Sequence, residues 1–373
     1  MASELQVNTI TEATSGSGIT FAKDVIPATP LSHRNMIING AMNVSQRGTS
    51  FTGVGDTTKT FSVDRFCYMF GYGTPAQRMT LSQTATSSST IGFENSLKVD
   101  CTTVESNLGS NTSRYSGIFQ LMEEQNLRHL LYGSSSAKTM TLSFYVKSSL
   151  TGTHGVAVTI NNGAAVLPQT YTVNTADTWE KKSVAIAGNT STAITTDPGM
   201  GIGFLLNTGT AQTDGTQNTW GTKFASTAVA NLMANTSYEL SITGVQLELG
   251  TVATPFEHRS YGDELQRCLR YYHAPIGGGI QAVGSASSTT SFSFSYSIGT
   301  RLRDTPSLVH INSASHRAYY PSGYSSSTTN FTIASMKGDI VQINAPGHSG
   351  LTDNRPYTLG MTGSYQIALS AEL

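Results

Sequence analysis

The organisation of this chain is decided by residues 244–273, GVQLELGTVATPFEHRSYGDELQRCLRYYH. Before this stretch, Leu240 and Ile242 alternate with polar residues, and after Gly244 the apolar residues continue with the other parity. A single glycine at such a change of phase is typical of a β-bulge within one long strand. We therefore expect the last strand of a β domain here, followed by a turn and a change of structure.

A short helix is expected directly after this strand. Ser260 and Asp263 stand three residues apart, as in a capping box at a helix N-terminus. Pro275 and the glycines at 277–279 predict its end. Apolar residues at i, i+3, i+4 and i+7 would form one stripe on its surface, namely Leu265, Cys268, Leu269 and Tyr272. We expect this stripe to hold two β domains together, which makes residues 260–275 a helical joint.

Charged residues make up only 12% of the 373 residues, compared with about 25% in an average globular protein. The net charge of -1 provides no field that attracts nucleic acid or an anionic membrane. No apolar stretch approaches the roughly 20 residues that span a bilayer. Cys67, Cys101 and Cys268 are odd in number and far apart, so we expect buried thiols and no disulfide framework. Neither nucleic acid nor a membrane is expected as a partner.

Strand patterns dominate from residue 34 to residue 259. Residues 140–146 and 156–160 alternate in polarity, and the glycine-bounded loop between them predicts a hairpin. Residues 199–206 predict a strand buried on both faces, and residues 123–132 a short helical turn. Strands about ten residues apart without βαβ alternation indicate an antiparallel jelly-roll sandwich.

The two ends of the chain form separate units. Residues 1–33 predict a small hairpin, which cannot be stable alone and must dock on its own chain or on another protein. Residues 276–373 predict a second β domain, because aromatic and aliphatic residues alternate with serines, as in 292–298. Its closing strand is expected to run to Leu373. The predicted fold class is therefore mainly β: a jelly-roll sandwich and a C-terminal β domain joined by one short helix.

Patterns that carry catalysis are weak in this sequence. The glycines at 199, 201 and 203 lead into an apolar strand and not into a helix N-terminus, so they do not predict a phosphate loop. Neighbouring carboxylates such as Glu123 and Glu124 point to opposite faces of a strand, whereas a glycosidase needs two that converge. We expect no catalytic residue and no cofactor.

No spacing of metal ligands stands out either. His310 and His316 flank a short segment, and polar loop residues are favoured there over a metal site. Calcium or magnesium bound by scattered carboxylates would leave no fixed spacing, and that alternative stays open. We expect no metal site.

Residues 316–324, HRAYYPSGY, are the best candidate for a recognition surface. Tyrosine and arginine are enriched in contact surfaces, and flat aromatic rings can stack on sugars. The alternative is that these tyrosines only cover the end of a sandwich. We expect an exposed segment between strands in which the following residues contact a receptor: His316, Arg317, Tyr319, Tyr320 and Tyr324.

Two segments resemble a known family. Residues 34–48, RNMIINGAMNVSQRG, with Val63-Asp64-Arg65-Phe66 after them, resemble the opening of bacteriophage tail-fibre and related virion β proteins, many of them from marine or freshwater phages. Residues 244–272 resemble the end of that family's carbohydrate-binding-module-like jelly roll and its short helix. The closing residues 370–373, SAEL, are similar to the ends of such chains. Together these segments bracket most of the sequence.

The resemblance implies a homotrimeric, non-enzymatic receptor-binding protein on the outside of a virion, made in the cytoplasm of a bacterial host. Residues 1–33 would attach to another virion protein, residues 34–259 would form the jelly roll, and residues 276–373 would face a glycan of the host surface. A short spike is favoured over a long fibre, since no heptads or collagen-like repeats supply a shaft. A capsid decoration protein or head fibre is the main alternative, and a polysaccharide depolymerase a third.

Overall fold

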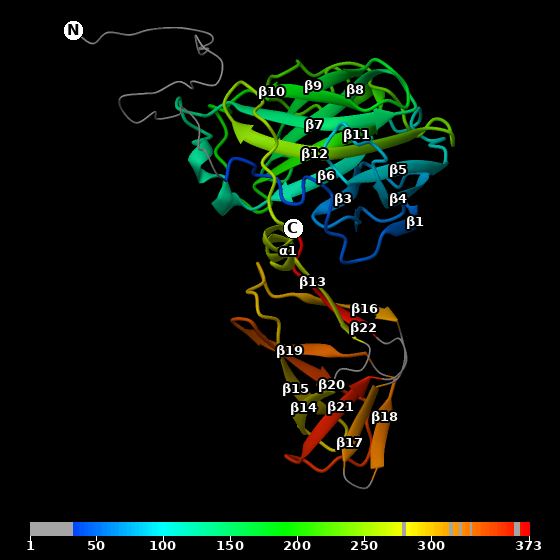
Figure 1. Ribbon diagram of the computed structural model, residues 1–373, viewed down its shortest axis with the longest axis vertical. Coiled ribbons are helices and arrows are strands. Elements are labelled where there is room, and N and C mark those ends of the chain that lie inside the picture. Colours follow the sequence, from blue (N-terminus) through cyan, green and yellow to red (C-terminus); the bar gives the residue numbers. More distant parts are fainter. Residues whose placement is uncertain (1–32, 278–280, 313–315, 321–322, 329, 362–365) are drawn as a thin grey trace, which may run out of the picture.

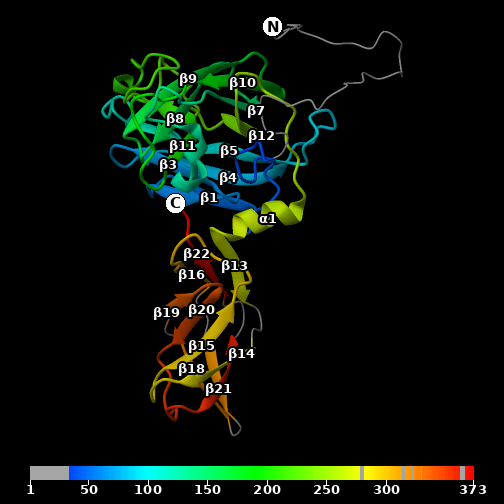
Figure 2. The same cartoon turned by 90° about the vertical axis from the view of Figure 1, so that its left-hand side faces the viewer.

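A computed structural model of the chain describes residues 33–277, 281–312, 316–320, 323–328, 330–361 and 366–373. The predicted hairpin within residues 1–33 therefore lies outside the described residues. Figures 1 and 2 show an elongated molecule with a β-sandwich at one end and a smaller β domain at the other. The helix α1 (Tyr261–Leu269) and the C-terminus lie between them. The predicted mainly β, antiparallel architecture is confirmed.

The larger domain is a sandwich of two six-stranded antiparallel sheets. The first sheet contains, in order, β1 (Ser50–Val54), β4 (Arg78–Ala85), β5 (Asn95–Thr103), β12 (Glu239–Leu249), β7 (Met140–Ser148) and β10 (Glu180–Ile186). The second contains β2 (Lys59–Phe61), β3 (Phe66–Gly71), β6 (Tyr115–Met122), β11 (Met200–Thr208), β8 (Gly152–Ile160) and β9 (Ala165–Val173). Alternate side chains of both sheets meet in one apolar core, as the strand period of two requires.

The strand β11 is buried on both faces, as predicted from residues 199–206. One face joins the central core, and the other lies under the segment that includes Phe224 and Ala225. Gly203 is needed here because a Cβ on it would lie 2.1 Å from the Phe119 ring. Gly203 therefore allows the Phe119 ring to pack closely on β11.

The predicted hairpin of residues 140–146 and 156–160 is wrong. The strand β7 pairs with β12 and β10 in the first sheet, whereas β8 pairs with β11 and β9 in the second. The chain crosses from one sheet to the other between Ser148 and Gly152, and the apolar side chains of both strands meet in the core. Alternation indicates which face of a strand is buried, but it does not indicate which strand is the neighbour.

Short helical turns connect some of these strands. The 3₁₀ turns η1 (Glu124–Asn126) and η2 (Arg128–Leu130) fall where a helical turn was predicted, and η3 (Thr210–Gln212) follows β11. The bulge predicted in β12 is also present. The register against β7 shifts between Thr243 and Gln246, and Gly244 has a φ of 59°. That left-handed conformation is accessible to glycine without strain.

The helix begins as predicted and ends earlier. The Ser260 hydroxyl accepts a hydrogen bond from the Asp263 amide at 3.2 Å and so caps α1. The helix ends at Leu269, and Tyr272 opens the strand β13 (Tyr272–Gly277), which contains Pro275. The prediction that Tyr272 continues the helical stripe is therefore wrong. The i+7 position was counted past the point where the chain becomes extended.

The smaller domain packs a three-stranded sheet against a seven-stranded sheet around its own apolar core. The three-stranded sheet contains β13, β22 (Gln366–Ser370) and β16 (Ser307–Asn312). The seven-stranded sheet contains β18 (Gly323–Ser327), β17 (His316–Tyr320), β21 (Pro356–Met361), β14 (Gln281–Ala286), β15 (Phe292–Ser297), β20 (Ile340–Ala345) and β19 (Thr332–Lys337). The closing strand stops at Ser370, three residues before the predicted Leu373.

All three cysteines are buried and free, as predicted. Burial raises the pKa of the Cys67 thiol to about 12, which keeps it protonated and unreactive at neutral pH. Among the described residues, no helix has both the length and the apolar character needed to cross a membrane.

Candidate functional site

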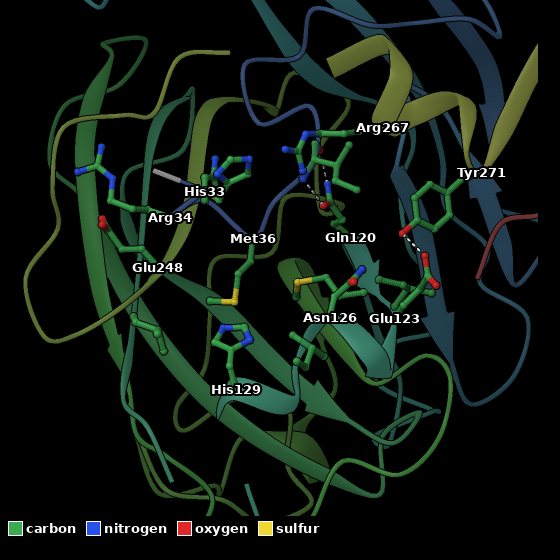
Figure 3. A pocket seen from close by; sticks show the side chains of 16 residues that line it. His33, Arg34, Met36, Gln120, Glu123, Asn126, His129, Glu248, Arg267 and Tyr271 are labelled. Carbon is green, nitrogen blue, oxygen red and sulfur yellow. Dashed lines mark hydrogen bonds between the residues drawn. The ribbon is translucent and has the colours of Figure 1, made fainter. Parts of the chain in front are cut away.

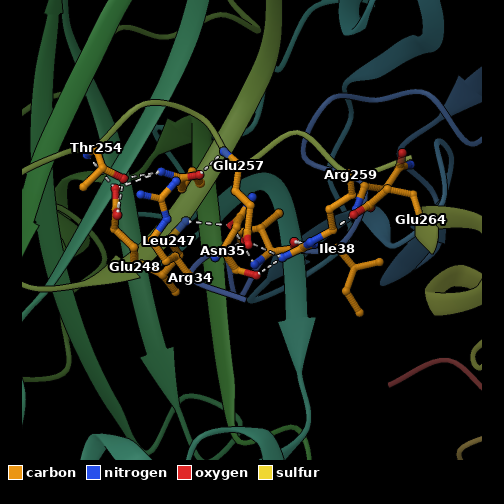
Figure 4. Close-up of polar contacts among 12 residues, drawn as sticks. Arg34, Asn35, Ile38, Leu247, Glu248, Thr254, Glu257, Arg259 and Glu264 are labelled. Atoms are coloured by element: carbon orange, nitrogen blue, oxygen red, sulfur yellow. Dashed lines mark hydrogen bonds and ion pairs between the residues drawn. The ribbon is translucent and has the colours of Figure 1, made fainter. Parts of the chain in front are cut away.

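Residues 34–48 are hydrogen-bonded to residues 244–272 along β12. The Asn35 side chain accepts hydrogen bonds from the amides of Ile37 (3.0 Å) and Leu247 (3.1 Å) and donates one to the Val245 carbonyl (3.1 Å). Figure 4 shows Arg259 crossing the same segment. It donates to the backbone carbonyl of Ile37 at 3.1 Å and to that of Asn35. The polar residues of both segments therefore serve the fold, because they satisfy buried backbone groups.

The turn after Asn35 connects the sandwich to α1. The Asn39 side chain bonds to the backbone on both sides of the turn, at the amide and carbonyl of Val44 and the carbonyl of Asp64. The backbone amide of Asn39 donates to the Glu264 carboxylate, which also accepts from Arg259 at 2.8 Å. Glu264 is thus a buried anchor of the helix.

The last residues of the chain return to the sandwich. The Glu372 carboxylate accepts from the Arg47 guanidinium at 2.9 Å and from that of Arg65. Each arginine also lies over an aromatic ring at the joint, Arg47 over Tyr272 at 3.5 Å and Arg65 over Tyr271 at 3.4 Å. Arg65 is buried and Arg47 is half-buried, so the shared carboxylate satisfies two charges that water reaches poorly.

The predicted joint residues divide into two groups. Cys268 and Tyr272 are buried, whereas Leu265 and Leu269 are half-buried. The apolar stripe of the helix is therefore only part of the joint. Sequence reasoning missed Glu264, Tyr271 and the arginine cluster, because apolar periodicity carries no signal for buried ion pairs.

A cavity of about 530 Å³ lies between the start of the sandwich, the 3₁₀ turns and α1, and we call it the central cavity. Figure 3 shows Met36 on one side, Arg267 projecting from α1, and Asn126 and His129 from the turns. The residues that line it are His33, Arg34, Asn35, Met36, Ile38, Gln120, Leu121, Met122, Glu123, Asn126, Leu127, His129, Glu248, Leu249, Arg267 and Tyr271. Apolar walls with a few polar groups are typical of small-molecule sites.

The two glutamates of the central cavity already have partners. Burial acts to raise the pKa of Glu123, but hydrogen bonds from Arg270 (2.7 and 2.9 Å) and the Tyr271 hydroxyl (2.6 Å) outweigh it and lower that pKa. Glu248 accepts from the Thr254 hydroxyl at 2.6 Å and from its amide at 2.9 Å. The charge of Glu123 is thus paired with an arginine, and the Glu248 carboxylate accepts hydrogen bonds from within the protein.

The five predicted receptor residues lie on a β-hairpin and not on a loop between strands. The strands β17 and β18 pair antiparallel at the edge of the seven-stranded sheet. Because successive side chains on a strand point to opposite faces, the five residues cannot act together. His316 and Tyr320 share the parity of buried Ala318, whereas Arg317, Tyr319 and Tyr324 belong to the other face.

His316 is wrong as an exposed receptor residue, since it is fully buried in the core. Its ring lies 4.4 Å from that of Phe331 and 4.9 Å from that of His348. Tyr320 is exposed to the same extent as Tyr319, although its ring also meets the buried Tyr357 ring edge-on at 6.1 Å. Both residues support the core side of the hairpin.

The other three residues form a cluster on the outer face, with both tyrosines exposed and the arginine half-buried, which we call the tyrosine platform: Arg317, Tyr319 and Tyr324. The two rings are cross-strand partners 5.7 Å apart, and the Arg317 guanidinium lies 4.3 Å from the centre of the Tyr324 ring. The Tyr319 ring lies over Gly360 of β21, where a Cβ would come within 2.5 Å of it. The glycine lets the ring lie close to the sheet.

The platform continues across the sheet. The register places Tyr324, Tyr319, Thr358 and Val283 in one row over four strands. Such a row spans about 14 Å, given roughly 4.8 Å between strands. Val283 is 71% exposed, Tyr324 49% and Tyr319 39%. Sequence reasoning missed Thr358, Val283 and Gly360, because only the strand pairing brings them beside the tyrosines.

The structure offers no metal centre in the described parts of the chain, where His, Cys, Asp and Glu side chains do not gather in groups of three or more. His310 belongs to β16 and His316 to β17, in different sheets. The two histidines that flank residues 311–315 are thus on separate elements.

Comparison with known proteins gives similarity to solved structures only. No family model matches the sequence, and no curated protein matches it. A CBM4 structure is 13% identical with a TM-score of 0.31, covering 57% of this chain and 98% of its own. The family 11 carbohydrate-binding module of the Clostridium thermocellum cellulase Lic26A-Cel5E is 15% identical with a TM-score of 0.25, covering 54% and 96%.

The enzymatically active domain of tailspike protein 4 from bacteriophage CBA120 is also similar. It is 12% identical with a TM-score of 0.27, and the match covers 58% of this chain but only 21% of the tailspike domain. At these identities and TM-scores the similarities transfer no ligand or activity to this chain.

Proposed function

We propose that this chain is a bacteriophage virion protein, a tail fibre or short spike, that attaches to a polysaccharide of the host surface through the tyrosine platform. The observation that carries the binding function is the pair of exposed rings, Tyr319 and Tyr324, lying along an open sheet face. Flat rings with polar tips suit sugars, whose faces are apolar and whose edges carry hydroxyls. The virion assignment rests on the resemblance of residues 34–48 and 244–272 to phage proteins.

Binding of host cells or purified envelope glycans to single-site variants tests the platform. We expect Tyr319→Ala and Tyr324→Ala each to weaken binding about five- to thirtyfold, because aromatic anchors typically contribute about 1–2 kcal/mol. Tyr261→Ala is the matched control, since Tyr261 is exposed and lies on α1, outside the platform. Equal binding by all three variants would contradict the proposal.

The proposed role is adhesion without hydrolysis. Glu123, the buried member of the acidic pair considered for a glycosidase, accepts hydrogen bonds from Arg270 and Tyr271 on both oxygens. Those contacts keep it ionised, whereas a general acid needs a raised pKa. Incubation with host glycan should therefore release no sugar, and released oligosaccharide would favour the depolymerase alternative.

Assembly and location are part of the same proposal. A homotrimer attached through residues 1–33 to another virion protein would present three platforms and raise avidity. Light scattering should give the mass of three chains, and the mass of one chain would overturn the trimer. Labelling within intact particles should place the protein on the tail, and labelling on the head would favour a decoration protein.

A further inference from the structure

Arg267 is a half-buried arginine at the meeting point of several hollows. It lies in the last turn of α1 and lines the central cavity and two open hollows beside the helix. Within the described part of the chain its guanidinium forms no hydrogen bond or ion pair. Its guanidinium nitrogens are open to solvent in these hollows, so an anion that enters can replace the water on them and form a charge-assisted contact.

The arginines around it differ in this respect. They pair with carboxylates as follows: Arg270 with Glu123 at 2.7 Å, Arg259 with Glu264 at 2.8 Å, Arg303 with Asp197 at 3.3 Å, and Arg128 with Glu124 at 3.1 Å. Arg34 also lines the central cavity and donates to the Pro255 carbonyl at 3.3 Å, so among the described residues Arg34 and Arg267 are its two arginines without a carboxylate partner, and Arg267 is the one that lies on α1. The surroundings therefore favour a bound anion.

The remaining walls of the central cavity indicate what else the ligand contains. Met36, Met122 and Leu249 provide apolar contact, and Asn126 and His129 present exposed polar side chains from the 3₁₀ turns. Figure 3 shows Asn126 and His129 across the cavity from Arg267. The volume of about 530 Å³ falls within the range of about 300–1,000 Å³ for small-molecule sites. A bare inorganic anion would leave most of it unfilled.

We propose that the central cavity binds a sugar that carries a carboxylate, such as a uronic acid. The carboxylate pairs with Arg267, whose planar guanidinium suits bidentate contact with it. One face of the sugar ring packs on Met36 and Met122, and its hydroxyls reach Asn126 and His129. This site is separate from the tyrosine platform and stands without it, since the two lie on different domains.

Titration of the full chain with glucuronate, followed by calorimetry or saturation-transfer NMR, tests this site. We expect Arg267→Gln to weaken glucuronate binding at least about tenfold, because a charge-assisted contact is lost. Arg128→Gln is the matched control, since Arg128 is exposed and already paired with Glu124. Asn126→Ala, on an exposed turn, should lower affinity as well and gives a second readout that does not depend on how α1 packs.

Four results would overturn the inference. Absence of glucuronate binding, or equal binding by Arg267→Gln, would remove the arginine site. If glucose bound as tightly as glucuronate, the carboxylate would have no role. If acetate or sulfate competed as well as glucuronate itself, the cavity would be a simple anion site. Tyr319→Ala should leave glucuronate binding unchanged, so that failure of the platform and failure of this site are distinguishable.

Discussion

Gly203 lies directly under the Phe119 ring in the second sheet of the sandwich. Because a Cβ there would overlap the ring at 2.1 Å, we expect Gly203→Ala to lower the free energy of unfolding by about 1–3 kcal/mol, as overpacked cores do. Gly109→Ala is the control, since nothing lies within 4 Å of its Cβ position. Urea unfolding measures both variants, and equal midpoints would show that the ring moves aside freely.

Glu123 gives the joint a defined dependence on pH. Burial acts to raise its pKa, but hydrogen bonds from Arg270 and Tyr271 prevail and lower it from 4.5. A carboxyl whose pKa is lower in the folded state than in the unfolded state stabilises the fold at pH values above its unfolded-state pKa. This contribution disappears as the pH falls through the folded-state pKa. Stability should therefore decline more steeply in the wild type than in Glu123→Gln between about pH 5 and pH 3. Melting temperatures across that range test this, and parallel curves would contradict it.

At the scale of elements, the half-buried Arg259 links α1 to the opening segment. Arg259 contacts Glu264, Glu257 and two backbone carbonyls of the opening segment. We expect Arg259→Ala to lower the free energy of unfolding by about 3–5 kcal/mol, because it leaves the buried Glu264 carboxylate without its cation. Arg128 forms an exposed ion pair with Glu124, four residues earlier, so Arg128→Ala should lower the free energy of unfolding by no more than about 0.5 kcal/mol. Similar unfolding midpoints for both variants would show that the anchor is dispensable.

The joint also shows how far sequence reasoning reaches for single elements. The cap at Ser260, the bulge at Gly244 and the buried strand β11 were predictable, because each depends on a local pattern. The neighbours of β7 were not, since pairing is decided by packing across the sandwich. For the candidate site, Tyr319, Tyr320 and Tyr324 were named correctly as exposed, whereas Arg317 is half-buried and His316 is buried. The division of the five residues between two faces requires knowing that the segment is a strand.

The whole molecule is held together where three distant parts of the sequence meet. The opening part of the sandwich contributes Arg47 and Arg65, the turn from α1 into β13 contributes Tyr271 and Tyr272, and the C-terminus contributes Glu372. The resemblance on which the proposed virion role rests lies in these same segments. Their shared pattern thus describes the junction between the domains, and it carries no information on what the tyrosine platform or the central cavity binds.

The connection between the domains can be tested at Glu372. Its removal in Glu372→Ala leaves Arg47 and Arg65 without their shared carboxylate, at an expected cost of about 3–5 kcal/mol, while the cores of both domains remain intact. The Leu373 carbonyl, which accepts from Lys59 at 2.5 Å, should be released with it. We expect a larger radius of gyration in small-angle scattering and two separate melting transitions. Asp304→Ala is the control, because Asp304 is exposed and lies 3.7 Å from Arg303. An unchanged radius and an unchanged melting profile in Glu372→Ala would mean that β13 and α1 alone hold the two domains in place.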